Sequence, residues 1–350
     1  IEVDFGEFDC PACAPQSTVP LKIPAWDRWR VRDDGEYYLT LEFVLKDDCP
    51  WAAHGHVVAR EQIAGKRPVP RPELPQETVA SVTDGTNEVV VTCGGTRATF
   101  SKSVGTLTRL SMDGKDVLAC ADGRAVGPRL EVMRALTDND SWLRKDLYAS
   151  GMTQLRYHAR PPKVERDESG IVRVRCSVDV TGRKSAGFLH ESVWTFRKGG
   201  TVAVENRVVP HGTMPPTLPR LGLGMKLDER LEKLSWYGRG PHENYVDRRD
   251  SAFFGVWRST VTEQYVDNVR PQDCGQKCDV RWMTLTDDAG WGVRFEMDRP
   301  FFCQALHYDW EDLELARHRR LGGGTVAPRI WHLNPPRQEI CLNLDILQLG

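Results

Sequence analysis

Apolar and polar side chains alternate along most of the chain, which is the pattern of β-strands that bury one face. Residues 172–180 alternate valine and cysteine with arginine, serine and aspartate, and residues 37–45, 291–297 and 340–346 follow the same rule. Turn-forming residues lie between neighbouring runs, at 94–95, 113–114, 198–200 and 287–290. Glycine in such short connections is typical of antiparallel hairpins. The pattern predicts an all-β fold of many antiparallel strands.

Two segments interrupt this pattern. Residues 310–320 space their apolar side chains three or four apart and predict one short helix that ends in a solvated, charged face. Residues 67–76 contain four prolines within eight residues, a run that cannot pair as an interior strand and favours a stiff connector. We therefore expect a boundary there, with three or four strands in residues 1–66 and a larger β domain over residues 77–350.

Composition narrows the possible partners. Lys plus Arg is 47 and Asp plus Glu is 49, and this near-balance argues against a nucleic-acid-binding surface. No run approaches the roughly 18 apolar residues that a membrane-spanning helix requires. Residues 1–8 lack the basic and then apolar pattern of a signal peptide. We expect a soluble, cytoplasmic protein without nucleic-acid or membrane partners.

Tryptophan and cysteine are both frequent, with eleven and ten residues respectively. Indole rings stack on sugars but also fill large β cores, so both roles stay open. Cys10 and Cys13 form a Cys-x-x-Cys pair, and Cys274 and Cys278 form a second, wider pair. The two pairs lie too far apart in the sequence to predict a zinc site. We expect no metal here and reduced thiols, and the pairs have no assigned role.

One polar loop contains Arg134, Asp138, Asn139, Asp140 and Trp142. In an extended segment the two aspartates lie two residues apart and share a face. Such a pair suits hydrogen bonds to sugar hydroxyls or ligation of a cation. The alternative is that these side chains cap their own backbone.

A second polar loop contains Arg239, His242, Glu243 and Asn244 within a glycine- and proline-bearing turn. His242 and Glu243 could act as an acid/base pair, whereas the alternative that we favour is an ion-pair network that fixes the loop. A retaining glycosidase needs two carboxyl groups about 5 to 5.5 Å apart, and no spacing selects such a pair. We therefore name no catalytic residue.

Eight tracts of the chain carry a resemblance. They are residues 51–59, 134–140, 218–223, 236–248, 269–272, 279–282, 316–318 and 342–345. In order and over nearly the whole chain, they resemble the C-terminal part of glycoside hydrolase family 2 β-galactosidases. The second tract is similar to the family's Arg-Ala-Pro-Thr-Asp-Asn-Asp run, with Leu136 in place of proline.

The resemblance implies the end of a five-domain enzyme. Residues 1–66 would be the latter part of the second immunoglobulin-like domain, and residues 77–350 the small-chain β-supersandwich, a galactose mutarotase-like fold. The catalytic glutamates and the magnesium and sodium sites would belong to a TIM barrel outside this segment. The tryptophan loop of the galactose pocket would follow Gly350. The segment alone is expected to be inactive. Its expected partners are a β-galactoside substrate, the other domains of the enzyme and a second copy of the enzyme.

By position, residues 134–142 correspond to the family loop that approaches the active site, so we expect them on the substrate side. The segment would complete the active-site wall and subunit contacts during retaining hydrolysis. A standalone carbohydrate-binding module is one alternative, and an aldose-epimerase-like enzyme is another. The adjacent His–Glu pairs are 190–191 and 242–243, and strand neighbours point to opposite faces, which argues against an epimerase.

Overall fold

The computed structural model describes residues 2–24, 26–32, 34–66, 73–119, 127–183, 186–320 and 329–349. The chain divides into two compact units, Ile1–Pro70 and Arg71–Gly350, here the N-terminal unit and the C-terminal unit. Residues 67–72 of the expected proline-rich connector lie outside the described residues.

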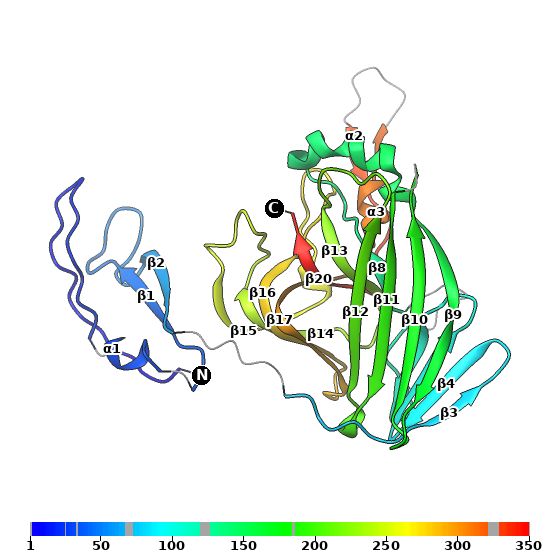
Figure 1. The fold of residues 1–350 in the computed structure, drawn as a ribbon. Coiled ribbons are helices and arrows are strands. Elements are labelled where there is room, and N and C mark those ends of the chain that lie inside the picture. The colour runs from blue at the N-terminus through cyan, green and yellow to red at the C-terminus, as the bar shows by residue number, and fades with distance from the viewer. Residues whose placement is uncertain are drawn as a thin grey trace. The chain divides into compact units, whose positions relative to one another are not determined.

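The N-terminal unit is built on one antiparallel hairpin (Figure 1). Strand β1 (Tyr38–Val44) pairs with β2 (Val57–Ala64), and a short helix, α1 (Trp26–Trp29), precedes them. The expectation of three or four strands is wrong for the described residues, which form two. Residues 2–24 form no paired strand and contain four prolines, each of which lacks the N–H that a ladder needs. No side chain in the described part of this unit is buried.

Three antiparallel sheets form the body of the C-terminal unit and confirm the predicted all-β sandwich. The five-stranded sheet has the order β3–β4–β5–β6–β7 (Ser81–Asp84, Glu88–Cys93, Thr96–Ser101, Leu107–Met112, Lys115–Asp116). The four-stranded sheet has the order β12–β11–β10–β9 (Val202–His211, Gly187–Phe196, Val172–Thr181, Arg156–Arg166). The seven-stranded sheet has the order β15–β14–β16–β17–β20–β13–β8 (Phe253–Thr260, Lys233–Gly240, Lys277–Thr286, Gly292–Leu306, Ile340–Gln348, Arg220–Leu227, Arg129–Glu131).

The predicted turns lie between paired strands. Residues 94–95 join β4 to β5, 113–114 join β6 to β7, 198–200 join β11 to β12, and 287–290 join β16 to β17. Asp113 and Gly114 both have positive φ, 51° and 78°. Two positive φ values in a two-residue connection are the geometry of a type I′ turn, which matches the twist of the strands.

Burial in the C-terminal unit follows the sequence alternation. In β10 the valines and Cys176 are buried, and the polar residues between them are partly or fully exposed. The largest core cluster joins all three sheets and includes Phe100 of β5, Trp194 of β11 and Trp236 of β14. The rings of Phe100 and Trp194 meet edge to face with centroids 5.5 Å apart. Removal of this apolar surface from water is the main force that holds the sheets together.

Two helices lie together at one end of the C-terminal unit (Figure 1). The sequence pattern missed α2 (Ser141–Ser150), which buries Leu143 and Leu147 and ends at Gly151 with φ 75°. Helix α3 (Trp310–Glu314) is shorter than the helix predicted over 310–320. The prediction of a charged helix end is wrong, because Arg317–Arg320 form β18 and pair with β19 (Arg329–His332), which supplies their backbone partners. No helix among the described residues is long and apolar enough to cross a membrane.

Four short 3₁₀ turns complete the described helical elements. They are η1 (Asp138–Asp140), η2 (Met152–Gln154), η3 (Lys198–Gly200) and η4 (Thr262–Gln264).

The last strand, β20, departs from the predicted alternation. Ile346 is 55% exposed, whereas the neighbouring Asp345 is fully buried. The pairing with β13 shifts at this point, from Leu221 opposite Leu347 to Gly222 opposite Asp345. The extra residue in β20 is a β-bulge, which changes the face toward which the flanking side chains point. The shift lies beyond Asp345, which pairs in the same register as residues 340–344, so the bulge accounts for the exposed Ile346, whereas Asp345 lies on the face of β20 opposite Leu344 and is buried there.

Candidate functional site

The first polar loop is a helical turn rather than an extended segment. Thr137 precedes η1, which continues directly into α2. The Asp140 carboxylate accepts hydrogen bonds from the Thr137 backbone N–H at 2.8 Å, the Thr137 hydroxyl at 3.1 Å and the Arg134 guanidinium at 3.1 Å. Asp140 and Arg134 are buried while Asp138 is exposed. The expectation that the two aspartates share a face is wrong, because the helical turn rotates the chain between them.

The tip of this loop is exposed. Asp138 exposes 78% of its side chain, and its Oδ1 lies 2.9 Å from Nη1 of Arg270. Asn139 is also exposed, and Trp142 is 60% exposed. The tip therefore presents a carboxylate, an amide and an indole ring. These are groups that hydrogen-bond to sugar hydroxyls and stack on apolar ring faces.

Glu314 of α3 ties the loop to both helices. Its side chain is 3% exposed and accepts from the Leu136 backbone N–H at 2.9 Å and the Tyr148 hydroxyl at 3.0 Å. It also pairs with Arg144 of α2. A shared, buried acceptor of this kind holds the loop, α2 and α3 in one arrangement.

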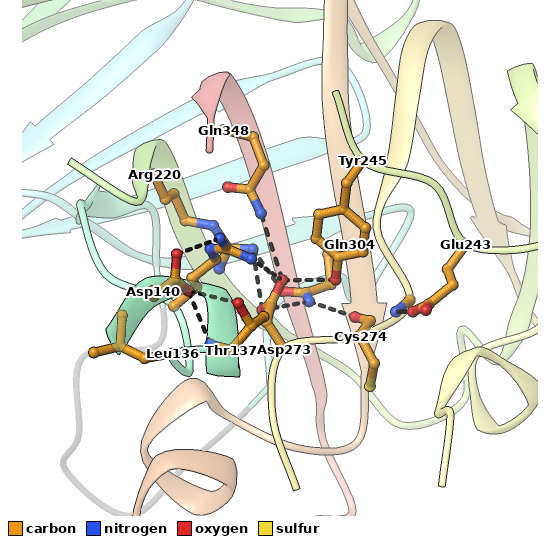
Figure 2. Close-up of polar contacts among 12 residues, drawn as sticks. Leu136, Thr137, Asp140, Arg220, Glu243, Tyr245, Asp273, Cys274, Gln304 and Gln348 are labelled. Carbon is orange, nitrogen blue, oxygen red and sulfur yellow. Dashed lines mark hydrogen bonds and ion pairs between the residues drawn. The ribbon is translucent and has the colours of Figure 1, made fainter. Parts of the chain in front are cut away.

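Asp273 is the hub of a buried polar cluster next to the loop (Figure 2). Its carboxylate accepts from the Tyr245 hydroxyl at 2.8 Å and the Gln304 amide at 3.0 Å. Guanidinium nitrogens of Arg134 and Arg220 lie 3.7 and 3.9 Å from its oxygens. All five residues are at most 4% exposed. Buried charges are costly unless they are paired and hydrogen-bonded. Moving the loop would separate the paired charges of this cluster, so the cluster holds the loop in this arrangement.

A third aspartate changes the charge balance of this cluster. Oδ2 of Asp345 lies 3.0 Å from Nε of Arg220, and both side chains are fully buried. Burial raises the pKa of Asp345 to about 7, against the lowering effect of Arg220 and with the help of Asp273 and Glu131. When Asp345 is protonated, the positive charges of Arg134 and Arg220 are therefore balanced by the negative charges of Asp140 and Asp273.

Sequence reasoning missed Arg220, Asp273 and Asp345 as site residues. A signal exists for two of them, because Arg220 and Asp345 are charged residues next to apolar strand runs, where an unpaired charge is rare. Asp273 follows Arg270, Pro271 and Gln272 in a polar, turn-like stretch, where an aspartate is ordinary. Only the fold brings Asp273 to the two arginines.

The second polar loop is held by contacts at its two ends. Nε of Arg239 lies 2.7 Å from Oδ2 of Asp279, and its Nη1 donates to two backbone carbonyls of the loop at 3.1 Å. Asn244 is fully buried, donates to a backbone carbonyl at 2.9 Å and accepts from the Cys278 N–H at 2.8 Å. Both side chains therefore satisfy backbone groups of the loop.

His242 and Glu243 have different partners. Nε2 of His242 lies 3.0 Å from the Ser251 hydroxyl. Glu243 accepts from the Gly275 N–H at 2.7 Å and pairs with Arg248 at 2.7 Å. These contacts favour the structural alternative, and an acid/base role for the pair stays a prediction.

His190 and Glu191 lie on opposite faces of β11. His190 lines a cavity of about 100 Å³, its Nε2 lies 2.9 Å from Oδ1 of Asn206, and burial lowers its pKa. Glu191 pairs with Arg207 at 2.8 Å. One sugar cannot lie between two groups that point to opposite sides of a strand.

The two cysteine pairs have different surroundings. Cys274 and Cys278 are fully buried, and burial raises the pKa of each thiol to about 12. Cys10 and Cys13 are exposed in the N-terminal unit. Every described cysteine is a free thiol. Within the described residues, no group of three or more His, Cys, Asp and Glu side chains is arranged to hold a metal ion.

Comparison with known proteins gives two family matches. Residues 92–350 match the β-galactosidase small chain, and residues 1–66 match β-galactosidase domain 4. A β-galactosidase of Priestia megaterium is 30% identical over 311 residues, which cover 87% of this chain and 29% of the relative. A β-galactosidase of Vibrio cholerae is 27% identical over 356 residues, covering 95% and 32%. A β-galactosidase of Kluyveromyces lactis is 26% identical over 319 residues, covering 86% and 28%. The chain spans about a third of the length of these relatives.

Proposed function

The chain belongs to the β-galactosidase small-chain family, and on this premise we propose that it is a non-catalytic part of a β-galactosidase. Its role is to complete one wall of the active site that holds a terminal β-D-galactoside. Two carboxylates of a TIM barrel then carry out hydrolysis with retention.

The observation that carries this proposal is the construction of the first polar loop. Its tip exposes Asp138, Asn139 and Trp142, whereas its base is fixed by the buried cluster around Asp273. An exposed polar tip on a fixed base suits a wall that must keep its position while substrates enter and leave. The named residues of the second loop, by contrast, make their polar contacts within the fold. We therefore favour the first loop as the one that faces the substrate.

The remaining assignments follow from the family. The magnesium and sodium ions of the enzyme would be held by the barrel, and the other domains and a second copy of the enzyme would be protein partners. Free thiols at all described cysteines support a reducing, cytoplasmic location.

Hydrolysis of a chromogenic β-galactoside tests the proposal. We expect no turnover by this chain alone and turnover by the chain extended upstream through the barrel. Turnover by the 350 residues alone would contradict the proposal and direct the search for a carboxylate pair to Asp138, Asp140 and Glu243. Binding of galactosides by the isolated chain, with no effect of Asp138 or Trp142 substitutions on the extended enzyme, would indicate a carbohydrate-binding module instead.

A further inference from the structure

A cavity of about 100 Å³ lies at the junction of the three sheets of the C-terminal unit. Its described walls come from residues 104–106, which connect β5 to β6 in the five-stranded sheet, and from residues 128–130, which include part of β8 in the seven-stranded sheet. The remaining wall is one face of β9, β10 and β11, which run side by side in Figure 1. None of the described lining residues belongs to either polar loop. A molecule in this cavity would contact all three sheets.

Most of the side chains that line the cavity are apolar. Cys176, Val178 and Val180 on the buried face of β10 line it, together with Val104 and Leu130. Protein interiors are close-packed, and voids larger than a water molecule are few. A buried water molecule needs roughly two to four polar partners, which valine and leucine side chains do not supply. A mainly apolar molecule therefore suits most of this space better than water does.

His190 of β11 contributes a hydrogen-bond acceptor to the wall. Its Nε2 lies 2.9 Å from Oδ1 of Asn206, and because an amide oxygen only accepts, Nε2 carries the ring proton. The residue is 7% exposed, and burial lowers its pKa, so the ring is neutral and Nδ1 keeps its lone pair. No hydrogen bond to this Nδ1 is formed within the part of the chain that the structure describes. A group that donates one hydrogen bond would satisfy it.

The other polar groups of the wall have partners in the fold. The hydroxyl groups of Thr106 and Tyr157 each donate to a backbone carbonyl at 3.0 Å. Oγ of Ser192 accepts from an indole N–H at 3.0 Å and keeps its own hydrogen as a donor. The guanidinium group of Arg129 lies over the Tyr157 ring, 5.3 Å from its centroid, and 3.9 Å from the carboxylate of Glu131. The cavity therefore suits a ligand with a single hydroxyl group, which can donate to His190 and accept from Ser192.

We propose that this cavity binds a small, neutral alcohol with one hydroxyl group, which donates to Nδ1 of His190 while the alkyl part packs against Val178 and Val180. An engineered apolar cavity of about 150 Å³ holds benzene, so a volume of about 100 Å³ admits a compact alcohol such as isobutanol. A sugar does not suit this wall, because most of its hydroxyl groups would lose water without gaining a partner. An anion does not suit it either, because the neutral ring has no proton at Nδ1 to donate.

Methyl NMR spectroscopy of the full 350-residue chain, with isotope-labelled valine, tests the site. The chain is titrated with isobutanol and with diethyl ether, an isomer of the same composition that has no hydroxyl donor. We expect isobutanol to shift the methyl signals of Val178 and Val180 saturably, and diethyl ether to bind there roughly 2- to 10-fold more weakly, the ratio that one ordinary hydrogen bond gives. Shifts that do not saturate, equal affinity for the two isomers, or saturable binding of D-galactose at these valines would overturn the proposal.

Three substitutions separate the acceptor from the apolar wall. His190→Phe keeps a ring but removes Nδ1, so it should lower the affinity for isobutanol to that for diethyl ether. Val178→Leu fills the cavity and should weaken binding of both isomers while leaving Tm at or above that of the parent. Val174→Leu is the matched control, since Val174 is buried on the same face of β10 but is not among the described lining residues.

The control should bind isobutanol as the parent does but have a lower Tm, because an added methylene over-packs a filled core. A clear loss of Tm in Val178→Leu would show that the space is already filled by the protein and would overturn the proposal. Undiminished binding in Val178→Leu would also overturn it, as would an unchanged preference for isobutanol in His190→Phe.

Discussion

The two polar loops of the C-terminal unit have similar residues but different burial. In the first loop, the ion pair of Arg134 and Asp140 leaves 1% of each side chain exposed. In the second, the pair of Arg239 and Asp279 leaves 17% and 26% exposed, and Arg248, which pairs with Glu243, is 53% exposed. Water can replace a lost partner in the second loop but cannot reach the base of the first.

This difference sets what each loop contributes to the fold. Removing one member of a sealed ion pair leaves an uncompensated charge in a low-dielectric interior, which costs far more than the pair itself contributes. An exposed pair is screened by water and salt and contributes little. The pair of Arg134 and Asp140 thus fixes the conformation of the first loop, whereas the pair of Arg248 and Glu243 stabilises the second loop only modestly. Burial, rather than residue type, decides the consequence of a substitution.

The largest expected effect on stability comes from breaking the buried ion pair of Arg134 and Asp140. Arg134→Met should lower the free energy of unfolding by about 3–5 kcal/mol, because Asp140 and Asp273 lose a buried cation. Arg270→Met, which removes the partner of the exposed Asp138, should cost about 0–1 kcal/mol. Urea unfolding of both variants measures the difference. Equal losses would show that burial does not separate the two pairs.

A second prediction concerns pH and Asp345. Burial raises its pKa to about 7 in the folded chain, whereas an unfolded aspartate titrates near pH 4, so the folded state binds more protons between these values. Stability should therefore fall by up to about 1.4 kcal/mol per pH unit as the pH rises from about 4 to about 7, and then level off.

The substitution Asp345→Asn should remove this loss of stability with rising pH. Urea unfolding over this pH range should find the variant more stable than the parent at pH 8 and similar to it at pH 4. Glu131, whose pKa burial also raises, should leave a slope of the same sign in the variant. An unchanged slope would show that Asp345 is already ionised beside Arg220.

Arg239 provides an intermediate case. Arg239→Met removes an ion pair and two hydrogen bonds to backbone carbonyls, and it should destabilise the chain by about 1.5–3 kcal/mol. Arg248→Met, in the same loop but exposed, should change stability by about 0–1 kcal/mol. Thermal unfolding can compare the two. A loss for Arg239→Met that matches that of Arg134→Met would remove the distinction between the two loops.

The smallest effect on stability is expected at the exposed tip. Asp138→Ala and Trp142→Ala should change the free energy of unfolding by about 0.5 kcal/mol or less. In the extended enzyme, however, each should raise KM or lower kcat for a chromogenic β-galactoside. Unchanged kinetics with a lowered Tm would assign these residues to structure alone.

Much of the fold could be predicted because strand alternation is a local property. The buried valines of β10 and the turn at Asp113 and Gly114 are visible in a few consecutive residues. The errors arose where a distant partner decides the outcome. Residues 317–320 continue a helical pattern but pair with β19, and Ile346 is exposed because β20 bulges against β13.

The candidate site was predictable only in part. Arg134, Asp138 and Asp140 stand together in the sequence, and the polar loop that contains them was identified from it. The sequence did not show which aspartate would be buried and which exposed. This depends on the turn η1 and on the neighbouring residues of α3 and of the turn at Asp273. Burial is a sum over neighbours from the whole chain, whereas a loop sequence contains only its own residues.

The amino-acid pattern alone therefore establishes an all-β class, the main turns and the family, since each depends on short-range periodicity or on long ordered tracts. The tertiary structure alone decides the charge balance of the interior. It brings Arg134 and Arg220 to Asp273, buries Asp345 beside Arg220, and leaves Asp138 and Trp142 exposed. The physical reason is that the energy of a charge depends on how much water surrounds it, and only the folded chain determines where water is excluded.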